Sequence, residues 1–152
     1  MSDHHQTSEQ LTDSKEQKFI VAKRLGHLLL GAFEVGVGVV TIGAWLTHFN
    51  VGFIACGAVM ALGGLAEVIK ETSWINRMLD GREEDDMRPA ALNAVGNFVV
   101  AAAEVALSIS SFATGNAFGI ASTILPAVVR VFDMANDLTE VAKESGELTS
   151  EV

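Results

Sequence analysis

Cysteine is almost missing from this sequence, and so are the short motifs that accompany catalysis or metal binding. Its 152 residues include a single cysteine, Cys56, so no disulfide framework can form. The G-x-S-x-G, P-loop, H-E-x-x-H and paired-cysteine patterns are all lacking from the sequence. We therefore expect that the protein is not an enzyme and that it carries no cofactor.

Charged residues are missing from two long stretches of the chain. In residues 25–69 the only charged side chains are Glu34 and Glu67, and in residues 89–129 the only one is Glu104. A soluble helical bundle needs a polar face along each helix, and neither stretch provides one. Hydrophobic residues make up 49% of the chain. The net charge of −9 is carried largely by the segments outside these two stretches.

The two stretches divide into four apolar segments, each of about 20 residues, which is enough to cross a hydrocarbon core of about 30 Å. We predict an all-α fold, a four-helix transmembrane bundle in a lipid bilayer. The helices are expected at residues 25–47, 51–70, 90–112 and 116–136. The alternative is a soluble bundle with an unusually apolar interior. A domain of this size, however, cannot bury four helices that are apolar all round.

The apolar segments come in two copies. Residues 25–43 align without a gap on residues 95–113, and residues 50–71 align on residues 116–137. The matched positions include three pairs of acids, which are Glu34 with Glu104, Glu67 with Asp133 and Glu71 with Asp137. We therefore interpret the bundle as two tandem helical hairpins, a parallel internal repeat.

The hairpins, at residues 25–70 and 90–137, leave three polar segments. Residues 1–24 lack a signal-peptide pattern and are expected to form a disordered tail. Residues 71–89 are expected to connect the hairpins through a short amphipathic helix that lies in the membrane interface. Residues 138–152 form an acidic C-terminal tail.

The basic residues predict the orientation in the membrane. Neither hairpin tip has a lysine or an arginine, whereas cations precede the first helix and follow the second. These cations are Lys15, Lys18, Lys23, Arg24, Lys70, Arg77, Arg82 and Arg88. By the positive-inside rule we expect a multi-pass protein with both termini and the central connection in the cytoplasm.

Ionisable and polar residues inside the spans are the candidate site, because such groups are costly in a membrane and usually functional. The candidates are Glu34, Glu104, Glu67, Asp133, Arg130, His27 and Asn97. Arg130 is the one cation within the predicted spans and the obvious partner for a buried carboxylate. Two interpretations stay open. The acids form a protonatable or cation-binding layer on a transport path, or they form a paired polar core that fixes helix register.

Two other uses of these residues are disfavoured. Four acids on four helices also suggest a di-iron carboxylate bundle, but that chemistry requires Glu-x-x-His pairs, and the sequence has none. We therefore predict no metal site. Nucleic-acid binding is not expected of an acidic chain that lacks a basic face.

Small residues are the other strong signal, because helices in lipid associate through close backbone approach. The candidate packing positions are Gly31, Gly36, Gly38, Gly43, Gly57 and Gly64. They predict partners within the membrane, either further copies of the chain or another membrane protein. The first functional hypothesis is thus a non-enzymatic membrane component that assembles through these faces and organises a membrane or complex. The alternatives are a small transporter or channel subunit, and a toxin, effector or lysis factor that inserts from solution.

Overall fold

The structure is a computed structural model that describes the backbone of residues 3–81 and 90–150 and the side chains of residues 14–81 and 90–146. Within these ranges the chain is all-α. It forms four helices, α1 (Asp3–Leu46), α2 (Val51–Leu79), α3 (Ala90–Ala113) and α4 (Ala117–Ser150). The acidic run at residues 83–86 and the cations Arg82 and Arg88 lie outside the described residues.

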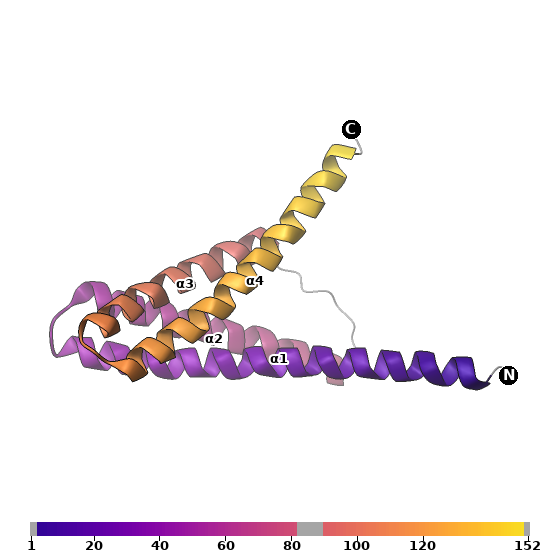
Figure 1. Cartoon of the computed structure of the whole chain (residues 1–152), viewed down its shortest axis with the longest axis horizontal. Coiled ribbons are helices and arrows are strands. Elements are labelled where there is room, and N and C mark those ends of the chain that lie inside the picture. Colours follow the sequence, from indigo (N-terminus) through magenta and orange to yellow (C-terminus); the bar gives the residue numbers. More distant parts are fainter. Residues whose placement is uncertain (1–2, 82–89, 151–152) are drawn as a thin grey trace.

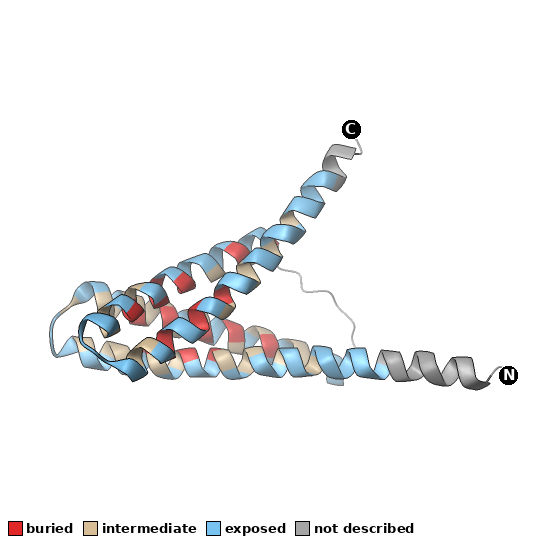
Figure 2. Cartoon of the chain, in the orientation of Figure 1, coloured by how far each residue is buried: buried red, intermediate tan, exposed pale blue. Residues whose placement is uncertain are grey.

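Each helix contains a segment long and apolar enough to cross a membrane. The segments are Ser14–Leu46, Val51–Leu79, Ala90–Ala113 and Ala117–Gly146. Large apolar side chains such as Leu29, Val40, Phe98 and Phe132 point outward and are exposed, while the buried residues line the inner faces (Figure 2). The all-α fold with four helices is therefore confirmed, and each helix is long and apolar enough to span a membrane, as expected of a multi-pass membrane protein.

The helices associate unevenly. α1 packs along α2 and α3 along α4, α2 meets α3 over a smaller area, and α1 meets α4 at only a few positions. Figure 1 shows both short connections at one end of the bundle and both chain ends directed away from it. We call these two ends the hairpin-tip side and the terminal side. The internal repeat and the cytoplasmic position of the termini stay predictions.

The helices reach further on the terminal side than the sequence analysis expected. α1 begins at Asp3 rather than at residue 25, so the segment expected to be disordered is helical. Residues 3–24 contain no proline or glycine, and nothing there interrupts a helix that the apolar segment has already nucleated. α4 likewise continues to Ser150.

In the described part of the central connection, residues 71–81, the separate amphipathic helix predicted within residues 71–89 is also not observed. α2 runs without a break to Leu79, is capped at Asp80, and is followed by Gly81 with a positive φ of 71°. Because α2 keeps its direction, Trp74 lies beside α1 instead of along the interface. The Arg24 guanidinium carbon sits 4.9 Å from the centre of the Trp74 ring, a cation–π contact.

Four of the six candidate glycines hold α1 against α2. A Cβ built on Gly38 would lie 2.6 Å from the carbonyl oxygen of Gly57, and one built on Gly31 would lie 2.7 Å from that of Gly64. The two backbones therefore approach more closely than any larger side chain permits. Gly36 and Gly43, by contrast, have open space where a Cβ would stand.

These distances predict opposite outcomes for two alanine substitutions on the same helix. Gly38→Ala should lower the free energy of unfolding by about 1–3 kcal/mol, because the added methyl group collides with backbone atoms of α2. Gly43→Ala should leave it unchanged or raise it by up to about 1 kcal/mol, because alanine is the better helix former. Denaturant titration in detergent micelles measures both. Equal losses for the two variants would contradict the packing described here.

Candidate functional site

Arg130 is the centre of the buried polar site and connects all four helices. It projects from α4, and only 4% of it is exposed. Its Nε donates to Oε1 of Glu34 on α1 over 2.9 Å, and its Nη2 donates to the other oxygen of the same carboxylate. This two-point contact matches the planar fork of the guanidinium to a carboxylate.

The remaining donors of Arg130 reach the two central helices. Nη1 donates to Oδ1 of Asn97 on α3 over 2.9 Å and to Oε2 of Glu67 on α2 over 3.4 Å. Nη2 also donates to the carbonyl oxygen of Gly63 over 3.3 Å. A guanidinium has five N–H donors, and these contacts use all five.

Glu104 lies next to this network but receives nothing from it. Its side chain is fully buried, and neither carboxyl oxygen has a hydrogen-bond partner among the described residues. Its charged neighbours are the Glu34 carboxylate and the Arg130 guanidinium. Since Arg130 has no donor left, Glu104 is an acid of the central cluster whose carboxyl group receives no hydrogen bond from the described residues.

A second polar layer lies towards the terminal side. Nε2 of His27 on α1 is 3.0 Å from Oδ2 of Asp133 on α4, and its Nδ1 is 2.9 Å from the carbonyl oxygen of Lys23. Both ring nitrogens thus face acceptors, and only a doubly protonated imidazole donates to both. Nδ2 of Asn97 donates to Oδ2 of Asp137 over 3.1 Å.

The sequence analysis missed several members of this layer. Asp137 and Glu71 were matched as repeat positions but not proposed as site residues. The Arg24 guanidinium lies 3.3 Å from Oε1 of Glu71, and Nζ of Lys70 lies 3.8 Å from the same oxygen. The signal was present, because Glu71 and Asp137 each follow a predicted site acid by four residues and so share its helix face.

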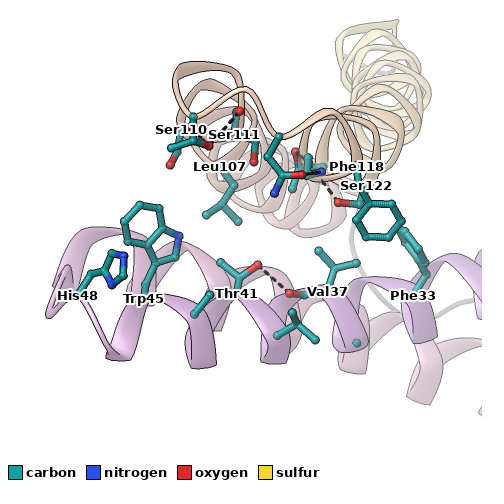
Figure 3. A pocket seen from close by; sticks show the side chains of 17 residues that line it. Phe33, Val37, Thr41, Trp45, His48, Leu107, Ser110, Ser111, Phe118 and Ser122 are labelled. Carbon is teal, nitrogen blue, oxygen red and sulfur yellow. Dashed lines mark hydrogen bonds between the residues drawn. The ribbon is translucent and has the colours of Figure 1, made fainter.

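The hairpin-tip half of the bundle contains a pocket of about 570 Å³ instead of a charged network. It lies between α1 on one side and α3 and α4 on the other (Figure 3). The lining carries several hydroxyl groups and the imidazole of His48, and no carboxylate, lysine or arginine side chain contributes to it.

The sequence-predicted site residues therefore fall into two groups. Glu34, Glu67, Glu104, Asn97 and Arg130 meet in one buried cluster, while His27 and Asp133 pair one layer further towards the termini. Within the described ranges, no three His, Cys, Asp or Glu side chains converge to hold a metal ion. Comparison with known protein families, curated proteins and solved structures finds no match to this chain.

Because all five donors of Arg130 are used, replacing Arg130 should cause a large loss of stability. A second substitution should restore part of that loss. Arg130→Met should lower the free energy of unfolding by about 3–5 kcal/mol, because it leaves a buried carboxylate without a partner. Adding Glu34→Gln to Arg130→Met should restore part of the loss, because the stranded charge disappears. Unfolding in detergent measures both variants.

The matched control is Arg24→Met. Its ion pair joins a partly exposed guanidinium to the buried Glu71 carboxylate, which keeps Lys70 as a second partner. The expected loss is therefore smaller, about 1 kcal/mol. A loss for Arg130→Met no larger than that for Arg24→Met would contradict the central role of Arg130.

Proposed function

We propose that this chain is a small, non-enzymatic integral membrane protein that moves protons, as a transporter or channel subunit, through the buried carboxyl group of Glu104. The observation that carries the proposal is the environment of Glu104. It is a fully buried acid without a hydrogen-bond donor, beside a guanidinium whose donors are all occupied.

A buried carboxylate without a donor is strongly unfavourable in a low-dielectric interior. The protonated acid is not, because its O–H can donate to the neighbouring Glu34 carboxylate. Glu34, in contrast, already accepts two charge-assisted hydrogen bonds from Arg130. The two acids therefore differ in what they can do, and Glu104 is the group suited to bind and release a proton.

The other acids of the site support a proton path in addition to a polar core that fixes helix register. Fixing the helix register needs only Arg130 and one carboxylate. Glu67, however, also contacts Arg130. Asp133 and Asp137 continue the polar residues towards the terminal side. Successive acids and histidines through a membrane are typical of proton relays. The cytoplasmic position of the terminal side, predicted from the basic residues, would make it the inner end of the path.

The charge of the cluster favours protons over metal cations. A metal ion at Glu104 would stand beside the Arg130 guanidinium, and two positive charges in a low-dielectric interior repel strongly. It would also need several oxygen ligands, whereas the acidic neighbour of Glu104, Glu34, already accepts two hydrogen bonds from Arg130.

The test is proton flux in liposomes that contain the purified protein and an internal pH-sensitive dye, driven by a potassium diffusion potential. Glu104→Gln keeps the size of the side chain and removes the proton site, so it should reduce the flux by at least about tenfold. Glu140→Gln, at an exposed acid on the same helix as Arg130, is the control and should keep it. Wild-type flux no greater than that of empty liposomes would contradict the proposal, as would full flux in folded Glu104→Gln.

Assembly with further copies is a second candidate function, and one observation favours it. Gly43 on α1 has open space where a Cβ would stand and lies outside the pocket, whereas Gly36 lines the pocket. A second helix can approach a position such as Gly43 closely. The third hypothesis, insertion from solution, rests on the sequence alone.

A further inference from the structure

The pocket in the hairpin-tip half combines apolar side chains, such as Phe33, Leu107 and Phe118, with hydroxyl groups that can bind water. Its walls carry hydroxyl groups from three helices, and Figure 3 shows several of them around the cavity. The hydroxyl residues are Thr41, Ser110, Ser111, Thr114, Ser122 and Thr123. A cavity holds water when it is polar and exceeds about 15 Å³ per molecule, and about 570 Å³ is ample for several.

The helix geometry adds acceptors to this lining. Thr41 donates its proton to the carbonyl oxygen of Val37 over 2.7 Å, so the lone pairs of its own oxygen remain for water. Pro126 lies inside α4 and has no N–H to give to the carbonyl group of Ser122 one turn earlier. Both features favour bound water over apolar filling.

A pair of hydroxyl groups links the pocket to the helical turn that carries Glu104. Thr123 lines the pocket, and its Oγ1 lies 2.7 Å from Oγ of Ser108. Ser108 is buried and donates to the backbone carbonyl of Glu104, one turn away on α3. The hydroxyl pair therefore connects the pocket to the backbone of the residue that carries the unpartnered carboxyl group.

The opposite side of Glu104 is closed. There the Arg130 guanidinium spans from α4 to α1, α2 and α3 and holds Glu34 and Glu67 in place. The groups on this side are thus committed to one another, whereas the pocket lies on the hairpin-tip side of Glu104.

We propose that the pocket is the hydrated entrance through which protons reach Glu104 from the hairpin-tip side, and that Thr123 and Ser108 position the last water. The inference rests on the proposed role of Glu104 as a proton-binding acid. In the step itself, a hydronium ion gives one proton to the Glu104 carboxylate and leaves as water, so that the acid becomes neutral. Thr123 and Ser108 are positioning residues that neither gain nor lose protons overall.

The first test distinguishes proton access to Glu104 from proton binding by Glu104. Thr123→Val keeps the side-chain shape and removes the hydroxyl, so it should lower proton flux by about tenfold. Thr139→Val makes the same change at an exposed threonine of α4 that does not line the pocket, and it should keep the flux. The infrared C=O band of the protonated Glu104 acid should persist in Thr123→Val and disappear in Glu104→Gln, because Thr123 acts on access and not on binding.

The second test examines hydration of the pocket without relying on flux. In a Cys56→Ser background, Ser111→Cys should react with a charged, membrane-impermeant methanethiosulfonate reagent, and the modification should block flux. The matched control is Ile109→Cys, at an exposed position on the same helix that does not line the pocket. It should not react, because it faces lipid.

The outcomes distinguish the two proposals. Full flux in Thr123→Val with loss of flux in Glu104→Gln would overturn the entrance and leave the function of Glu104 standing. An unreactive Ser111→Cys in the folded protein would overturn the entrance whatever the flux. Absence of wild-type flux would overturn the proposed function and the entrance that rests on it.

Discussion

The structure depends on one buried guanidinium whose five donors are all satisfied. A charged group inside four apolar helices persists only when its hydrogen bonds are made within the protein, because lipid offers none. Arg130 meets this requirement by drawing one partner or more from each of the other helices. The relative rotation of the helices is therefore tied to a single side chain, since turning any helix removes an acceptor from it.

The same constraint explains why the bundle is closed at one end and hollow at the other. α1 and α4 have little direct packing, and ionic contacts join them through Glu34 with Arg130 and through His27 with Asp133. Both contacts lie on the terminal side of the pocket. Towards the hairpin tips no charged pair joins the two helices, and the space between them remains as a hydroxyl-lined pocket.

The sequence predicted the fold class better than it predicted where the helices begin and end. The lack of charge in two stretches indicated four membrane helices, and Arg130 stood out as the one cation among buried acids. The sequence could not show that Arg130 selects Glu34 over Asp133, which is nearer in the chain, because helix rotation decides that choice. It also misjudged the polar ends. Apolar patterning marks where a membrane span stops, whereas a helix continues until a breaker such as Gly81 or a hairpin tip ends it.

A polar core that fixes helix register and a proton path are compatible in this architecture. Glu104 is the residue that the proton path requires and the fixed register does not. If the polar core served only to fix the helices, Arg130 with Glu34 and Asn97 would suffice, and an apolar residue at position 104 would be less costly. Glu104 instead adds a buried acid that the guanidinium cannot serve. The satisfied part of the network fixes the Glu34 carboxyl group beside Glu104, where it can accept a hydrogen bond from the protonated acid. The contacts that fix the helices thereby create the conditions in which Glu104 can bind a proton.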